Sequence, residues 1–165
     1  MIQPDIAQLI DSIPTLSVAD DSMPLYSAVL PPVPWDLAGV EQTLAVTLPP
    51  DVISLWEYVG TVRLFEDTTY GQWGLILWSP EQIMQNQPAE LAWYPDDVRP
   101  GDLIIGEFLG DSERLLVRCD ISQPDYGSIM VVLPLDPRSD WYTISNSLGN
   151  FLQEFIAHSG QKFWE

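Results

Sequence analysis

The side chains that most often carry catalysis or bind metals are scarce in this sequence. His158 is the only histidine and Cys119 the only cysteine. A general base needs a nucleophile or an orienting partner, and a zinc site needs about four ligands, mostly His and Cys. His158 falls near the end of an expected helix, where the helix dipole favours a cation. Cys119 alternates with Leu115 and Val117, as a buried strand cysteine does. Neither residue therefore predicts a reactive centre.

Carboxylates are the one reactive group in excess, and they leave a single enzymatic alternative open. A pair of them can serve a hydrolase, but none stands in a recognisable pairing. A calcium loop alternates oxygen ligands around a turn, and neither Asp96-Asp97 nor the segment 111–113 has that pattern. The glycines at 106 and 110 lack the Lys-Ser/Thr step of a phosphate-binding loop. We predict no cofactor, no metal site and no enzyme, with a carboxylate-based enzyme as the least favoured alternative.

The charge is strongly negative and unevenly spread. The sequence has 24 acidic and 6 basic residues, which give a formal net charge of −18. The first 62 residues hold eight of the acids and no base, since the first base is Arg63. Such a surface repels phosphate backbones and anionic lipids, so nucleic-acid and membrane binding are not expected. A basic protein partner would be attracted; the alternative is that the acidity only keeps the protein soluble.

The location expected from these features is the cytoplasm. The residues from Met1 to Asp5 contain no basic segment and no long apolar segment of the kind found in a signal peptide. The longest apolar stretches, such as 129–135, are too short to span a membrane. A single cysteine allows no internal disulfide, which suits a reducing compartment.

The first 34 residues are predicted to form a short helix followed by a Pro-rich extended arm. Apolar residues at helical spacing (Ile6, Leu9, Ile10 and Ile13) indicate the helix. Between residues 14 and 34, five prolines and the pair Asp20-Asp21 interrupt any regular pattern. We expect the arm to pack on the domain, which spans residues 35–165, through three apolar residues: Leu25, Tyr26 and Leu30.

Four further helices are marked by their capping residues. Asp36 is placed to cap a helix over 37–44, and Pro50 suits the first turn of a helix that Gly60 would end. Ser79-Pro80-Glu81-Gln82 is a capping box that begins a third helix. A closing helix with apolar residues from Leu148 to Phe155 would be capped by Ser145 or Ser147.

Between these helices the hydrophobic period changes to two, which indicates strands. The predicted strands cover residues 62–65, 73–78, 103–109, 114–121, 126–133 and 141–143. Short turns between them imply antiparallel pairing, and helices grouped at the ends imply layered packing. The predicted fold class is α+β: an antiparallel meander sheet with flanking N-terminal and C-terminal helices packed on it.

Three loops of this predicted sheet combine acids with aromatic side chains, as a protein-binding patch does. The candidate partner-binding residues are Glu66, Asp67, Tyr70, Trp93, Tyr94, Asp96, Asp97, Asp111 and Glu113. A meander could bring some of these loops to one edge. The alternative is that they are ordinary solvated turns.

Three segments, in this order, resemble the SUKH superfamily, which includes the SMI/KNR-type cell-wall regulators of yeast. Residues 40–51 contain an acidic helix residue, a leucine and then Leu-Pro before the next helix. Residues 103–111 with 115–120 resemble the central hairpin of that superfamily. Residues 144–152 resemble its closing helix. The resemblance covers roughly residues 35–158.

This resemblance implies an antiparallel sheet of about six strands with helices on one side, and no shared catalytic residues. Many bacterial members of the superfamily are immunity proteins that bind and neutralise toxin domains, often nucleases or deaminases. The expected function is therefore an immunity-type protein with a cognate, basic toxin domain as partner. A regulatory or scaffolding protein without a toxin partner is the alternative, in which the Pro-rich arm would be a docking segment.

Overall fold

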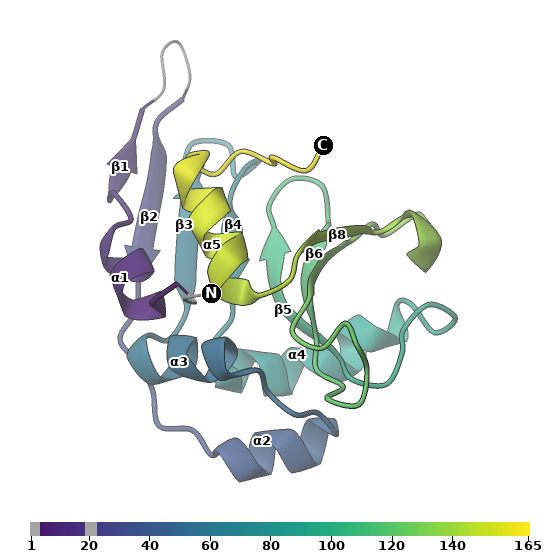
Figure 1. Cartoon of the computed structure of the whole chain (residues 1–165). Coiled ribbons are helices and arrows are strands. Elements are labelled where there is room, and N and C mark those ends of the chain that lie inside the picture. The colour runs from purple at the N-terminus through teal and green to yellow at the C-terminus, as the bar shows by residue number, and fades with distance from the viewer. Residues whose placement is uncertain (1–3, 19–22) are drawn as a thin grey trace.

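The fold is one antiparallel sheet with helices packed around it (Figure 1). The structure is a computed structural model and describes residues 4–18 and 23–165. The strands are β1 (Leu16–Ser17), β2 (Leu25–Val29), β3 (Val62–Glu66), β4 (Leu75–Leu77), β5 (Asp102–Phe108), β6 (Arg114–Arg118), β7 (Ile129–Val132) and β8 (Tyr142–Ser145). The helices are α1 (Ile6–Asp11), α2 (Leu37–Leu44), α3 (Pro50–Tyr58), α4 (Pro80–Ala92) and α5 (Leu148–Ala157), with a short 3-10 helix η1 (Arg138–Asp140).

The order of the strands in the sheet follows the chain from β1 to β8, so every strand pairs with its sequence neighbours. The predicted α+β class and antiparallel meander are therefore confirmed. None of the helices within residues 4–18 and 23–165 combines the length and apolar character that crossing a membrane requires.

Helices cover both faces of the sheet, whereas the resemblance implied one. Helix α5 lies in front of β3 and β4 (Figure 1), and its Phe155 packs edge-on against Phe108 of β5 with ring centroids 6.5 Å apart. Side chains alternate along a strand, so Glu107 points to the opposite face from Phe108. There Arg114 lies 4.0 Å from Glu107 and 3.0 Å from Glu90 of α4. Helix α4 therefore packs on the face opposite α5.

Both capping predictions for α4 and α5 agree with the structure. The Ser79 hydroxyl accepts the Gln82 N–H at 3.3 Å, and the Gln82 side-chain oxygen accepts the Ser79 N–H at 2.9 Å. This is the reciprocal capping box read from the sequence. At α5 the cap is Ser147, whose hydroxyl accepts the Asn150 N–H at 3.1 Å.

Gly60 does not end α3 in the way that its position predicted. The helix ends at Tyr58, and its C-cap, Val59, has an extended backbone. Gly60 is needed instead for a close approach of two backbones, because a Cβ there would lie 2.6 Å from the Pro31 carbonyl oxygen. The Gly60 N–H donates to the Leu30 carbonyl at 2.9 Å.

Residues 14–34, expected to be an extended arm, contribute two strands to the sheet. Strand β1 pairs with β2, and β2 pairs with β3. The sheet therefore has eight strands where about six were expected. Of the residues expected to hold the segment on the domain, Leu25 is partly buried, while Tyr26 and Leu30 are exposed. Backbone hydrogen bonds also hold this segment on the domain, including the one from the Leu30 N–H to the Thr61 carbonyl at 2.9 Å. The pair Asp20-Asp21 lies outside the described residues.

Gln87 of α4 takes the place of a strand beside β5. Strand β4 ends at Leu77, so the backbone of Ile104 in β5 has no strand partner on that side. The side-chain amide of buried Gln87 donates to the Ile104 carbonyl at 2.9 Å, and its oxygen accepts the Ile104 N–H at 2.8 Å. A side-chain amide has the same donor and acceptor pair as a peptide group. Gln87 therefore fixes α4 to the central strand.

Replacing Gln87 with alanine is expected to lower the free energy of unfolding by about 2–3 kcal/mol, because two buried backbone groups of Ile104 lose their partners. Gln85 is exposed on the same helix, and Gln85→Ala should change stability by less than about 0.5 kcal/mol. Urea unfolding followed by tryptophan fluorescence measures both. Equal effects of the two substitutions would contradict this role of Gln87.

Candidate functional site

The two residues with the most reactive side chains occupy structural positions. Cys119 is buried, and burial raises the pKa of its thiol far above the ordinary value. A thiol held protonated is a poor nucleophile. His158 is exposed at the C-cap of α5, where its Nδ1 lies 2.7 Å from the Glu154 carbonyl oxygen. In the part of the chain that is described, no three His, Cys, Asp or Glu residues group to hold a metal ion.

The first candidate loop, after β3, is organised by its own acids. Glu66 is held by Arg63 at 2.7 and 2.8 Å, and this pairing lowers the pKa of the Glu66 carboxyl. Asp67 is buried and accepts the N–H groups of Thr69 and Tyr70 at 2.9 and 3.0 Å. It therefore shapes the turn and does not face a partner. The Tyr70 side chain is 69% exposed, so it is the accessible member of this loop.

The two acids of the second candidate loop, between β5 and β6, share one lysine from the C-terminal segment. Asp111 and Glu113 both pair with Lys162, at 2.8 Å in the case of Glu113. Burial raises the pKa of the Glu113 carboxyl, and the bond from Lys162 opposes that rise. This loop lies beside the first one, because the Leu109 N–H donates to the Gly74 carbonyl at 2.8 Å.

The third candidate loop, after α4, contacts a different part of the molecule. Tyr94 is buried and packs edge-on against Trp141 at 5.7 Å between ring centroids. Asp97 accepts the Arg138 N–H at 3.1 Å. Asp96 is exposed, and Trp93 is 78% exposed. Of the three loops, the structure thus brings the first two together, and the contacts of the third are with residues 138–141.

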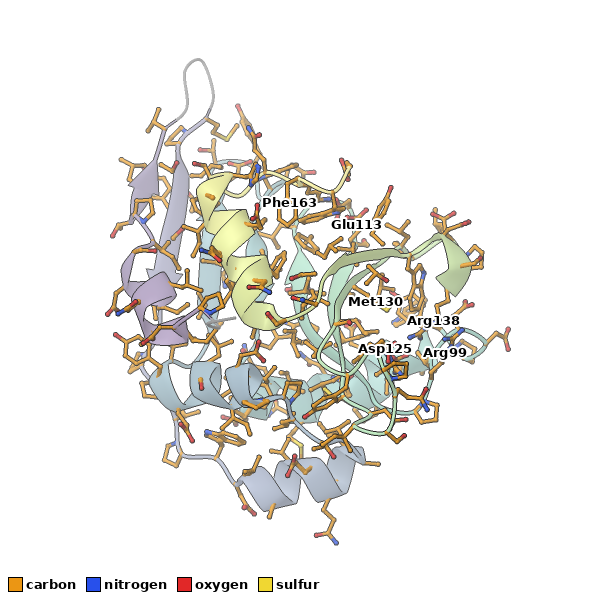
Figure 2. The ribbon with its side chains drawn as sticks, in the orientation of Figure 1. Arg99, Glu113, Asp125, Met130, Arg138 and Phe163 are labelled. Atoms are coloured by element: carbon orange, nitrogen blue, oxygen red, sulfur yellow. The ribbon has the colours of Figure 1, made fainter. Side chains whose placement is uncertain are left out.

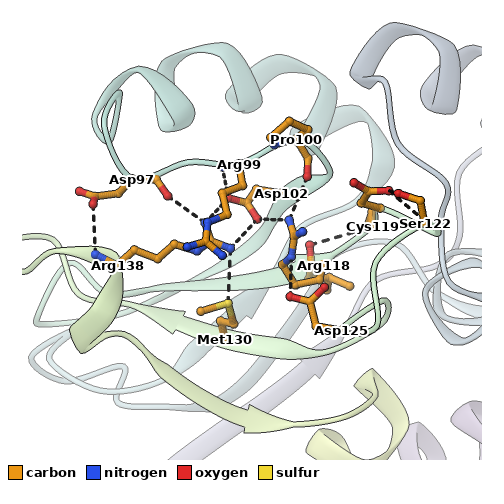
Figure 3. Close-up of polar contacts among 12 residues, drawn as sticks. Asp97, Arg99, Pro100, Asp102, Arg118, Cys119, Ser122, Asp125, Met130 and Arg138 are labelled. Carbon is orange, nitrogen blue, oxygen red and sulfur yellow. Dashed lines mark hydrogen bonds and ion pairs between the residues drawn. The ribbon is translucent and has the colours of Figure 1, made fainter.

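A buried ion-pair network lies next to the third loop and is joined to it through Arg138 (Figure 3). The Asp102 carboxylate binds Arg118 at 2.6 Å and Arg138 at 2.6 and 3.1 Å, and it also accepts the Arg99 N–H at 2.7 Å. Arg118 donates further to Asp125 at 3.0 Å. Figure 2 shows this group apart from Glu113, which lies beside the C-terminal segment that carries Phe163. Its partners lie within the domain, so we assign it to stability and not to binding.

Most of the positive charge of the chain is used internally. Five of the six basic side chains form ion pairs with acids of the same chain, and the sixth, Arg99, is exposed. The five paired residues are Arg63, Arg114, Arg118, Arg138 and Lys162. The carboxylates left over therefore dominate the surface that an approaching molecule meets.

A large hollow lies elsewhere, between α1, α3 and the loops before β7 and α5. Its volume is about 690 Å³, and we call it the α1–α3 groove. It is lined by residues 4–7, 49–51, 54, 57–58, 126–127 and 146–147. Figure 1 shows how these elements converge near the N-terminus and the start of α5. Four distant segments form it, so no local pattern in the sequence could have indicated it.

The comparison with family models gives one match that covers most of the chain. The model described as SMI1 / KNR4 family (SUKH-1) matches residues 31–154. A search of curated proteins found none that matches the chain. The matched region includes β3 to β8 and α2 to α4, together with most of α5.

Proposed function

The chain belongs to the SMI1/KNR4 family (SUKH-1), and from this premise we propose that it is a non-catalytic, immunity-type protein that binds a basic toxin domain. The resemblance identified in the sequence supports the non-catalytic part, because the superfamily has no shared catalytic residues. Many of its bacterial members neutralise toxin domains, which supports the immunity role.

The observation that carries the proposal is the internal pairing of the cations. With five of six basic side chains engaged within the domain, the net charge of −18 is presented to solvent mainly as carboxylates. Complementary charge accelerates association and disfavours partners of the same sign. A nuclease with a positive groove for nucleic acid is the class of partner that such a surface blocks best.

The exposure of each side chain reduces the set of candidate residues that a partner could touch. Three of the nine candidate positions have side chains free to make direct contact: Tyr70, Trp93 and Asp96. An exposed tryptophan is a typical anchor of a protein interface. Of the other six, Asp67 and Tyr94 are buried, and Asp97 accepts the backbone N–H of Arg138. The remaining three, Glu66, Asp111 and Glu113, are paired with a basic side chain of the same chain. We therefore retain Tyr70, Trp93 and Asp96 as proposed contact positions.

Co-expression with the C-terminal domain of the protein encoded immediately upstream tests this function. The expected result is restored growth of a host poisoned by that domain, together with a stable one-to-one complex. The association rate should fall at least about tenfold between low and high salt, while the dissociation rate changes less. An association rate that does not depend on salt would contradict the electrostatic part. Absence of both rescue and complex would contradict the immunity role.

A regulatory or scaffolding role is the second candidate, and exposed apolar side chains near the N-terminus favour it. Leu16, Val18 and Leu30 are each about half exposed, at 49%, 60% and 53%. Failure of the co-expression test would move the assignment to this role. Deleting residues 1–34 would not test it cleanly, because that removes β1 and β2 from the sheet.

A further inference from the structure

The α1–α3 groove has a negative rim, and none of the described residues that line it is basic. Its lining includes three carboxylates, those of Asp5, Asp51 and Glu57, and no Lys, Arg or His. Among the described residues, no basic side chain forms an ion pair with any of the three. The groove is therefore a place where a cation gains and an anion loses electrostatic energy.

Carboxylates already accept backbone N–H groups at two of the helix starts beside the groove, those of α1 and α5. The Asp5 carboxylate accepts the Gln8 N–H at 3.1 Å, and Asp51 accepts the Gly149 N–H at 3.0 Å. Pro50, in the first turn of α3, has no N–H to donate. A phosphate would thus meet carboxylates where it normally meets free backbone donors.

The rest of the groove is mainly apolar and aromatic, with Ser54, Asn146 and Ser147 as its polar members. Tyr58, whose hydroxyl donates to Asp11, is 39% exposed, and Tyr126 of the β6–β7 loop also lines the groove. Pro4, Pro49 and Pro50 complete this apolar part. Aromatic faces beside carboxylates suit a guanidinium, which stacks on a ring and pairs with a carboxylate in two-point fashion. The methylene stem of the same side chain would lie on the prolines.

We propose that the α1–α3 groove docks an arginine-bearing segment of the basic partner. This inference rests on the proposed function only for the partner's being basic. It adds a second contact region, apart from the loops that carry Tyr70 and Trp93. The occupant follows from charge complementarity, from the two tyrosines that line the groove, and from the carboxylates that accept backbone N–H groups at the starts of α1 and α5.

The test uses the full-length chain and the peptide Gly-Arg-Gly-Arg-Gly-Arg amide as probe. Amide chemical shifts of the ¹⁵N-labelled protein are followed during titration. The expected result is a saturable shift confined to residues of the groove, such as Glu57, Gly127 and Asn146. Glu57 is exposed on α3, so Glu57→Lys should leave the fold intact and weaken peptide binding by about tenfold.

Glu154→Lys is the matched control, because Glu154 is exposed near the end of α5 and does not line the groove. It changes the net charge by the same amount and should alter the affinity by less than about twofold. Tyr126→Phe should bind normally, and Tyr126→Ser about threefold more weakly, because only the latter loses the ring. Equal weakening by Glu57→Lys and Glu154→Lys, or shifts spread over the whole acidic surface, would overturn the proposal.

Failure of this inference and failure of the proposed function give different results. If the co-expressed toxin domain is neutralised equally by the native chain and by Glu57→Lys, the function stands and the groove is not the docking site. If the peptide binds in the groove but no toxin domain is neutralised, the groove stands and the immunity role fails.

Discussion

Replacing Asp102 with alanine is expected to lower the free energy of unfolding by about 3–5 kcal/mol, the usual cost of breaking a buried ion pair from one side. The Asp102 side chain is 1% exposed and binds both Arg118 and Arg138. The side chains of Arg118 and Arg138 are 4% and 9% exposed, so neither guanidinium group can regain water without opening the fold. Urea unfolding followed by tryptophan fluorescence gives the loss directly.

Asp125→Ala provides the control, because Asp125 pairs with the same Arg118 but its side chain is 45% exposed. Its removal should cost only about 1 kcal/mol, as for a bond that solvent can replace. A triple replacement of Asp102, Arg118 and Arg138 by Leu, Leu and Met removes the charges together and should recover much of the lost stability. If Asp102→Ala and Asp125→Ala unfold at the same urea concentration, the network does not have the role assigned to it.

Replacing Gly160 with alanine is expected to cost about 3–5 kcal/mol, the sum of backbone strain and overpacking. Gly160 has φ +83°, a conformation that disfavours a side chain. An added Cβ would lie 2.4 Å from Cβ of Phe65, whose side chain is buried in the core. The segment after α5 would have to leave the sheet to relieve the contact.

Gly71→Ala separates the two contributions. Gly71 has φ +66°, yet nothing lies within 4 Å of the position that its Cβ would take. Only the strain of the left-handed backbone is added there, about 1–2 kcal/mol. Thermal unfolding of both variants should therefore show a clearly larger shift for Gly160→Ala. Shifts of equal size would mean that the C-terminal segment is free to move away from Phe65.

The elements that the sequence predicted well are those marked by local chemistry. The Ser79–Gln82 capping box lies where four consecutive residues place it. The central strands β5 and β6 follow from apolar runs with a short turn between them. Each of these signals is complete within a few residues, so no tertiary information is needed to read it.

Strand β2 escaped prediction because its pattern is inverted. Its buried position is Ser27, whose hydroxyl accepts the Phe65 N–H at 2.9 Å, while Tyr26 and Val29 are exposed. A polar residue pointing inward between exposed apolar ones is the opposite of what binary patterning expects. The prolines near β2 also favoured the prediction of an extended arm over that of a strand.

The candidate patch depended on side-chain pairing that the sequence does not show. Asp111 and Glu113 look available for a partner until Lys162, about 50 residues later in the chain, is seen to bind both. Asp67 looks like a solvated turn residue, but it is buried and holds the turn together. Composition gives the sign of the net charge, whereas tertiary contacts decide which carboxylates remain free.

The sheet can form strand by strand during synthesis, because each new strand pairs with the strand that precedes it in the chain. The entropy lost on closing a loop grows with its length, and most closures in a meander are short. Two connections are longer: residues 30–61 between β2 and β3 hold α2 and α3, and residues 78–101 between β4 and β5 hold α4. Helix α5 comes last, so the rings of Phe65 and Phe108 remain uncovered until Phe155 has left the ribosome. Nascent-chain chaperones would thus find their apolar target on this sheet only in the interval between the pairing of its strands and the docking of α5.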